Sequence, residues 1–568
     1  MNLNEMRDLV SVAKGEKLAD LLLANAKIVN TFVGEIEQGD VAIFRDRIAG
    51  VGDYQANQVI DLEGKYLAPG LINGHTHIES SLLHITQYAR AVVPRGTCAV
   101  VTDLHEIANV AGLKGIKYIL KYAEPLPLSL FLMVPSCVPA TQLETSGACI
   151  TADNVQTALG GKGVIGLGEM MNFPGVLAGD KEVLLKLALS KSKVIDGHAP
   201  GLKGKELSAY LATGIGSDHE STTREEAEEK LNRGMWLMLR EGSSEKNLDV
   251  LLPLVTDKTC HRCMFVVDDR SCADLLRDGD IDAVVRKAIQ RGLDPIQAIQ
   301  LATINPAQYF RLGGFGAIAP GYLANLIVIS DLANFQIERV FYQGKLVAEE
   351  GKPLFSVEIS KDEELKHTIN IKPFSPEALR ITAESWHHPI IEIIPGQIVT
   401  KKRWEQAKVE GGFVVSDTNR DILKLAVVER HKATGNIGLG LVKGFGLKKG
   451  AMASSIAHDS HNIVVAGTND EDIFRAIKEI ERLQGGLAIA AEGQILASLS
   501  LPICGLLSEE PLEVVVESLE KLERIASDLD CQITSPFSPL SFLALPVIPE
   551  LRLTDLGLVD VEAFKLIK

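Results

Sequence analysis

The sequence predicts an α/β protein built around a (β/α)8 barrel, with a small β-sandwich assembled from both flanks of the barrel and an additional C-terminal α/β domain. Short apolar runs alternate with amphipathic stretches over about 250 residues, the usual length of such a barrel. β-like runs of similar character lie on both sides of that segment. The chain of 568 residues is also longer than one hydrophobic core accommodates, so several domains are expected.

Composition and charge exclude several classes of protein. Hydrophobic residues make up 46% of the chain and charged residues 23%, which is typical of globular proteins. The formal net charge of −16 argues against binding to nucleic acid or to an anionic membrane surface. We find neither an apolar run of about 20 residues nor a signal-peptide core near the N-terminus. The eight cysteines are scattered, which is typical of reduced thiols, so we expect a cytoplasmic protein.

Residues 1–67 are predicted to supply a helix and the first part of the β-sandwich. Apolar residues recur at helical spacing in residues 1–24, although Gly15 interrupts them. Short β-like runs broken by Gly and Asp follow, and similar runs return after the barrel. We predict that these two sets pair, so that residues 318–372 complete the sandwich. The runs are 26–30, 40–44 and 48–52 before the barrel, and 324–329 and 337–344 after it.

Residues 68–317 are predicted to form the barrel. Amphipathic stretches at 223–234 and 281–291 are expected to be helices. In such barrels the active site lies at the C-terminal ends of the strands, so functional residues should directly follow apolar runs. The candidate strands are 98–102, 130–134, 163–167, 193–196 and 263–267.

A pair of histidines follows the apolar run that ends at Pro69–Gly70. Side chains alternate between the two faces of a strand, so His75 and His77 can point to one place. Neutral imidazole is the commonest nitrogen ligand of divalent metals in proteins. The alternative is a pair of ordinary polar residues after a turn. Further ligand-type residues after later strands make a metal site the better interpretation.

Ligand-type residues follow several other apolar runs. A single histidine there is more often a hydrogen-bonded loop residue, and a single acidic residue is usually a helix N-cap. A whole set in one register is not easily explained in that way. Together with the first pair, it offers nitrogen and oxygen ligands for two divalent ions bridged by a carboxylate, a site that lowers the pKa of bound water towards ~7. The residues are His105, Glu106, Glu169, His198, His219, Asp268 and Asp269.

Several segments match motifs of a known family. They are residues 69–81, 105–109, 134–139, 168–172, 197–202, 217–223, 268–270, 302–307 and 453–462. With these motifs the chain resembles the amidohydrolase superfamily and, within it, the bacterial and archaeal adenine deaminases. The resemblance covers nearly the whole chain. It implies hydrolytic deamination of adenine to hypoxanthine and ammonia by a metal-activated hydroxide, in purine salvage and adenine catabolism.

The resemblance also implies a binuclear centre with manganese or iron, and zinc is compatible with the same nitrogen and oxygen ligands. Glu169 would bridge the two ions, where many relatives carry a carbamylated lysine. Asp268 would be the ligand from the last strand and the base that orients the hydroxide, with the adjacent Asp269 as the alternative. The other ligands would be His75 and His77 on one ion, and His198 and His219 on the second.

The reaction also needs an acid that protonates ring nitrogen N1, because the ring otherwise carries unstabilised negative charge in the transition state. Glu79, Glu106, Glu220 and His105 are the candidates. We favour Glu220 because it directly follows a predicted ligand histidine. The family-type loop at Ser136 is predicted to contact the substrate, as is Glu79.

Residues 373–568 are predicted to form the C-terminal domain, with helices at 470–483 and 511–527. The segment His458–Asn462 follows a run of small apolar residues. We interpret it as a lid over the barrel mouth or a substrate contact, through His458, Asp459 and His461. A structural turn and a separate metal site are the alternatives.

Two other functions are consistent with the sequence. An amidohydrolase acting on another aminopurine or on a cyclic amide would carry the same barrel ligands, because fold does not determine substrate. A non-enzymatic metal-binding or scaffold protein on a decayed barrel is less compatible with the intact ligand set. The resemblance also makes a homodimer or a larger homo-oligomer plausible.

Overall fold

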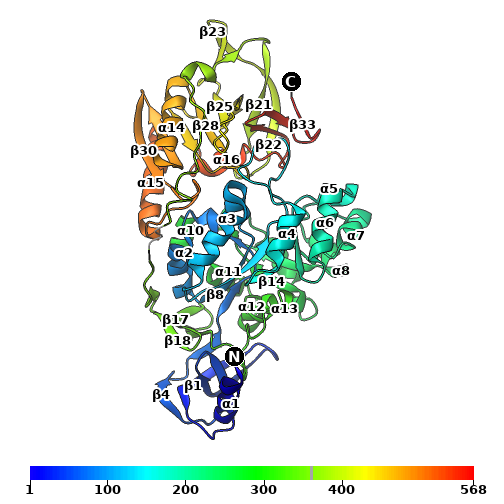
Figure 1. The fold of residues 1–568 in the computed structure, drawn as a ribbon, viewed down its shortest axis with the longest axis vertical. Coiled ribbons are helices and arrows are strands. Elements are labelled where there is room, and N and C mark those ends of the chain that lie inside the picture. The colour runs from blue at the N-terminus through cyan, green and yellow to red at the C-terminus, as the bar shows by residue number, and fades with distance from the viewer. Residues whose placement is uncertain (359–361, 568) are drawn as a thin grey trace.

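The computed structural model describes residues 1–358 and 362–567. Figure 1 shows three parts stacked along the long axis: the N-terminal strands at the bottom, a central α/β part, and the C-terminal domain at the top. Within the described residues, no helix combines the length and the apolar character needed to cross a membrane.

We expected a helix over residues 1–24, and this prediction is wrong for the residues after Ala13. Helix α1 (Leu3–Ala13) ends there, and Gly15 then adopts φ +73°, a left-handed conformation that glycine reaches without steric cost. Strand β1 (Ala19–Asn30) follows, and its Leu21 and Leu23 pack into the core of a sheet. Leu21 and Leu22 fit a helical face by spacing alone, but pairing with β2 (Glu35–Phe44) makes them part of a strand.

The two flanks of the central part meet in one nine-stranded sheet with the order β19-β18-β17-β16-β5-β1-β2-β3, in which β4 also pairs with β1. The junction is the antiparallel pairing of β5 (Tyr66–Pro69) with β16 (Leu326–Asp331). The chain therefore enters and leaves the central part at neighbouring strands. The remaining strands are β3 (Arg47–Val51), β4 (Ala56–Asp61), β17 (Gln336–Tyr342), β18 (Lys345–Glu349) and β19 (Lys352–Pro353).

The central part contains a five-stranded and a three-stranded parallel sheet. A backbone hydrogen bond of 3.0 Å from Gly216 N to Ile195 O links them, and the parallel pair β7 (Thr76–His77) and β15 (Asp268–Asp269) links their other edges. The five strands are β6 (Leu71–Asn73), β8 (Thr97–Thr102), β9 (Ser129–Val134), β10 (Val164–Met170) and β11 (Val194–Gly197). The three are β12 (Ser217–Asp218), β13 (Trp236–Arg240) and β14 (Cys263–Val266).

Helices surround these strands (Figure 1). Helix α3 begins directly after β8, so the residues at its N-terminus lie at the end of that strand. The amphipathic stretches noted in the sequence correspond to α8 and α11. The main helices are α2 (Ile85–Val92), α3 (His105–Ala123), α4 (Ala152–Leu159), α6 (Lys181–Ser190), α7 (Gly204–Leu211), α8 (Arg224–Asn232), α10 (Cys272–Arg277), α11 (Ile281–Gln290), α12 (Pro295–Leu301) and α13 (Ile304–Tyr309).

The C-terminal domain contains an eight-stranded sheet with the order β22-β21-β26-β25-β28-β27-β29-β30 and two small three-stranded sheets. Helices α14 (Asp470–Leu483) and α15 (Leu512–Asp528) pack on it, and α16 (Phe537–Phe542) lies beside β27. The loop between β27 and β28 reaches the central part. The strands are β21 (His387–Ile393), β22 (Thr400–Gln406), β25 (Ile422–Val428), β26 (Ile437–Lys443), β27 (Ala451–Ser454), β28 (Ile463–Gly467), β29 (Gly486–Ala491) and β30 (Gln494–Ser500).

Backbone hydrogen bonds join the C-terminal domain to the central part. Ser508 N donates to Leu82 O at 2.7 Å, and His84 N donates to Ser508 O at 2.8 Å. The junction is therefore a short parallel strand contact in addition to side-chain packing.

Candidate active site

Glu169, near the end of β10, lies among histidines that come from four other strand ends. Its Oε2 atom is 2.8 Å from His198 Nδ1 and 3.2 Å from His219 Nε2. Its Oε1 atom is 3.4 Å from His77 Nε2 and 3.9 Å from His105 Nδ1. The two oxygens therefore face two different sets of imidazoles, as a bridging carboxylate requires.

Asp268 and Asp269 point in different directions although they are adjacent. Asp268 Oδ1 lies 3.0 Å from His77 Nε2 and 3.5 Å from His75 Nε2. Asp269 instead accepts a hydrogen bond from the Ser80 hydroxyl. Asp268 has φ +60°, a strained conformation for a residue with a side chain, and such strain is concentrated at functional sites. The geometry thus places Asp268, and not Asp269, among the histidines.

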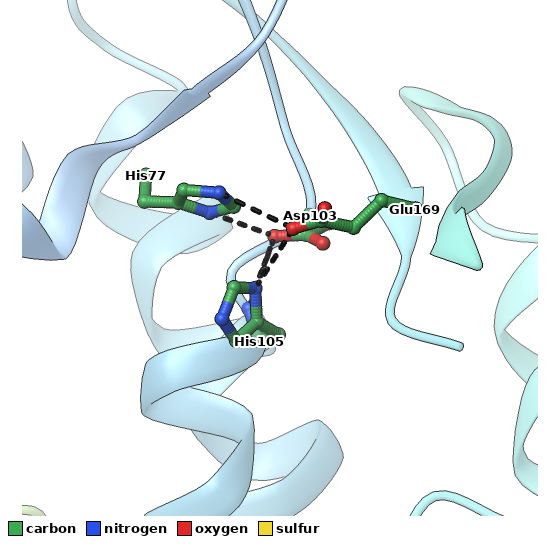
Figure 2. Close-up of side chains that lie close together, drawn as sticks. All are labelled: His77, Asp103, His105 and Glu169. Atoms are coloured by element: carbon green, nitrogen blue, oxygen red, sulfur yellow. Dashed lines mark hydrogen bonds and ion pairs between the residues drawn. The ribbon is translucent and has the colours of Figure 1, made fainter. Parts of the chain in front are cut away.

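The structure adds Asp103 to this group (Figure 2). Asp103 follows β8, and its Oδ1 atom is 3.0 Å from His105 Nδ1 and 3.2 Å from His77 Nδ1. The sequence carried a signal for it, because Asp103 directly follows a predicted strand as the other ligand-type residues do.

Arg240 is a second residue that the sequence did not single out. It ends β13, a strand absent from our predictions, and its guanidinium is buried. Its Nη1 atom donates to Asp268 Oδ2 at 2.6 Å and to Glu220 Oε1. Because Arg240 occupies one oxygen of Asp268, the other oxygen is left to face His75 and His77.

The residues of this site fit divalent metal ions. Groups of nitrogen and carboxylate atoms within 4.8 Å of one another include His75, His77 and Asp268, and also His75, Glu169 and His219. The side chains of His75 and His77 are only 4% exposed, and among the described residues His75 Nε2 has no hydrogen-bond partner. Burying several carboxylates and an unpartnered nitrogen is costly without a compensating cation. The donor set of imidazole and carboxylate suits manganese, iron or zinc.

The pKa values reflect this crowding of charge. Burial alone would lower the pKa of His77, but the Asp103 carboxylate raises that pKa well above its usual value. Burial would raise the pKa of Glu169, yet His198 and His219 hold it well below the usual range. Burial raises the pKa of Glu79 to about 7. Glu169 is therefore an anion near neutral pH, and the Glu79 carboxyl binds a proton much more readily than an ordinary glutamate.

A cavity of about 190 Å³ lies between the strand ends and the C-terminal domain. Glu79, Glu106 and Asp269 line it on the side of the central part, and His458, His461 and Phe542 line it on the other. Its remaining wall is largely apolar.

The predicted C-terminal segment reaches this cavity. His458 Nδ1 and His461 Nε2 each contact one carboxylate oxygen of Glu106. The His458 ring stacks on Phe542 with centroids 4.5 Å apart. Two histidines of the C-terminal domain thus hold a carboxylate of the central part.

Two other predicted substrate contacts lie outside the cavity. Ser136 is buried behind the site, where its hydroxyl donates to the backbone oxygen of Glu169. Asp459 is also buried, and its Oδ1 atom is 4.0 Å from His105 Nε2. Neither residue is among those that line the cavity.

Comparisons with known proteins match this architecture. The model of the amidohydrolase family matches residues 66–347, and that of the adenine deaminase C-terminal domain matches residues 397–565. An adenine deaminase of Dehalococcoides mccartyi (strain ATCC BAA-2266 / KCTC 15142 / 195) is 60% identical over 99% of both chains. Adenine deaminase 2 of Carboxydothermus hydrogenoformans is 53% identical over 99% of both chains. The adenine deaminase of Halalkalibacterium halodurans is 45% identical over 98% of this chain and 97% of that protein. The chain therefore belongs to the adenine deaminase family of amidohydrolases.

Proposed function

We propose that this protein catalyses the hydrolysis of adenine to hypoxanthine and ammonia. The observation that carries the proposal is the position of Glu169, whose two oxygens face histidines from separate strand ends beside a cavity. The relatives named adenine deaminase match the chain along its whole length, including the C-terminal domain that closes this cavity. Purine salvage is the role that this activity would serve.

The arrangement of the strands supports the predicted domain division. The two parallel sheets, linked at both edges, are consistent with a (β/α)8 barrel over residues 68–317. Residues 1–67 and 318–372 then form the flanking β part, and residues 373–568 form the C-terminal domain.

We infer that the site holds two divalent ions, manganese or iron. Such ions, when bound, supply Lewis acidity and lower the pKa of water. Glu169 would hold both of them, and Asp103 would offer a further ligand atom on the His77 side. The other proposed ligands are His75, His77 and Asp268 on one side, and His198 and His219 on the other.

Asp268 is the residue that we propose to accept the proton of the attacking water. Arg240 keeps the carboxylate in one orientation through Oδ2, so Oδ1 faces the histidines. This anchoring removes the need to reorient the base during the reaction, which is how preorganised groups lower a barrier.

Glu79 replaces Glu220 as the acid that we favour for protonating N1. Glu220 is paired with Arg240, which occupies its Oε1 atom. Glu79 lines the cavity, accepts a hydrogen bond from Ile107 N at 3.2 Å through Oε1, and has no partner for Oε2 within the described chain. That free oxygen can carry a proton towards a ring nitrogen. Glu106 is less suited because two histidines occupy its oxygens.

The test is ammonia release from adenine by protein purified with added manganese, with the metal content measured on the same sample. Adenine turnover with at least two metal ions per chain is the expected result. Bound metal without adenine turnover would still support a metal-dependent hydrolase. Other aminopurines and cyclic amides would then be tested as substrates. Absence of bound metal after reconstitution would contradict the proposed site.

A further inference from the structure

A second group of ligand-type side chains lies where the barrel meets the C-terminal domain. His105 and Glu106 begin α3, and Asp459 comes from the loop between β27 and β28. His105 Nε2 is 3.6 Å from Glu106 Oε1 and 4.0 Å from Asp459 Oδ1. The three side chains are between 3% and 6% exposed. The group therefore joins two domains at a site from which water is largely excluded.

The second ring nitrogen of His105 faces the two carboxylates of this group. Its Nδ1 atom is 3.0 Å from Asp103 Oδ1 and lies within hydrogen-bonding distance of that carboxylate. Its Nε2 atom points the other way, towards Glu106 and Asp459. Two buried carboxylates beside one imidazole are unfavourable unless a positive charge lies between them.

Asp459 gives a separate indication of a ligand. Its Oδ2 atom is buried and has no hydrogen-bond partner in the part of the chain that the structure describes. Protonation of His105 would compensate the Nε2 side of the group but would leave this oxygen unpartnered. A cation bound by the carboxylate would satisfy it.

The separations suit a divalent ion. Imidazole nitrogens and carboxylate oxygens bind such ions at about 2.0–2.2 Å, so two ligands of one ion lie no more than roughly 4.2 Å apart. The two distances from His105 Nε2 fall within this limit. His458 and His461 hold both oxygens of Glu106 and so orient its carboxylate.

We propose that a divalent cation binds between His105, Glu106 and Asp459, as a site additional to the proposed catalytic ions. The donor set of one nitrogen and two carboxylates suits manganese, iron or zinc. Such an ion would fasten the loop that carries Asp459 to the start of α3. It would thereby keep the C-terminal domain seated over the cavity.

The first experiment counts binding sites on the intact wild-type protein. Metal-free protein is titrated with Mn²⁺, and free Mn²⁺ is followed by electron paramagnetic resonance. We expect saturation at one ion per chain more than the two proposed for catalysis. Saturation at two ions or fewer would overturn the inference.

Variants then assign the additional ion. Asp459→Asn keeps the shape of the side chain but removes its charge, and we expect it to bind one ion fewer than wild type. The matched control is Glu144→Gln, which changes another buried carboxylate near Asp459 that lies outside the proposed group. Glu144→Gln should retain the wild-type count. An unchanged count in Asp459→Asn would contradict the assignment.

Two further variants separate this site from the catalytic one. Glu106→Gln should also bind one ion fewer, and it replaces Asp459→Asn if circular dichroism shows that the latter is unfolded. Glu169→Gln should lose metal from the barrel and keep the additional ion. Loss of metal in Glu169→Gln but not in Asp459→Asn or Glu106→Gln would refute this inference and leave the proposed function intact. Loss of metal in Asp459→Asn and Glu106→Gln but not in Glu169→Gln would refute the proposed catalytic centre and leave this inference intact.

Discussion

Two buried carboxylates, Glu169 and Glu106, are each contacted by several histidines, but the histidines come from different places. Those around Glu169 follow other strands of the same central part. Those that hold Glu106 lie 352 and 355 residues further along the chain, in another domain. The first arrangement follows from the register of neighbouring strands. The second forms only when two domains dock, so we expect the same residue types to perform a chemical task in one place and an assembly task in the other.

The largest expected effect comes from Glu169→Gln. A neutral amide bridges two cations poorly, so deamination should fall to background and the metal content should drop. Ammonia release and metal analysis on the same sample test this. Full activity of this variant with two metal ions per chain would mean that Glu169 is not needed to bind them. The proposed difference in role between Glu169 and Glu106 would then be lost.

Loss of one histidine from the second arrangement should have a smaller effect. His458→Ala frees one oxygen of Glu106, and we expect kcat to fall by about 10- to 100-fold, as for other residues that orient a site. His458→Ala should retain the metal ions that Glu169→Gln loses. His458→Gln still offers a hydrogen-bond donor and should recover part of the activity. Equal activities of the alanine and glutamine variants would show that the contact with Glu106 is not the reason for the loss.

Arg240 tests whether the barrel site depends on a cation supplied by the protein. Arg240→Met leaves the Asp268 and Glu220 carboxylates buried without their common partner. Breaking such a pair typically lowers the free energy of unfolding by about 3–5 kcal/mol. Chemical denaturation measures this change, and Arg240→Lys, which keeps the charge, should lose less. A wild-type stability in Arg240→Met would mean that bound metal alone balances the two carboxylates.

Asp280 is a buried carboxylate whose side-chain hydrogen bonds come from Thr97 and Asn73 and not from histidine. Burial raises its pKa to about 6 from 3.8. Because the folded carboxyl holds its proton more tightly than the unfolded one, the free energy of unfolding should fall as pH rises from about 4 to 6, by roughly 3 kcal/mol at most. Asp280→Asn should remove this part of the pH dependence. Unfolding curves of both proteins at pH 4 and pH 7 provide the comparison, and identical pH profiles would exclude Asp280 as the cause.

Strand register explains how much of the site could be predicted. His75, His77, Glu169, His198 and Asp268 each follow or end an apolar run, and parallel strands bring such positions to one end of the sheet. Asp103 obeys the same rule, but the His105–Glu106 pair two residues later gave the stronger signal for a metal ligand.

The remaining contacts depend on tertiary structure. Arg240 ends a strand that carries no ligand-type residue, so nothing local marks it as a partner of Asp268. Contacts between His458 and Glu106 require the docking of two domains, which no local pattern encodes. The error at β1 has the same origin, since pairing with β2 and not spacing decides the conformation of Leu21 and Leu22.

The contact of Glu106 with His458 and His461 also has a consequence for synthesis. All the residues around Glu169 have been made once the ribosome passes Asp269, whereas His458 follows roughly 190 residues later. At about 5–20 residues per second, the barrel mouth stays uncovered for roughly 10–40 s in each round of translation. Metal can enter the nascent site during that interval without any domain having to open. We therefore expect the order of the domains along the chain to leave a period during synthesis in which metal can bind to the site.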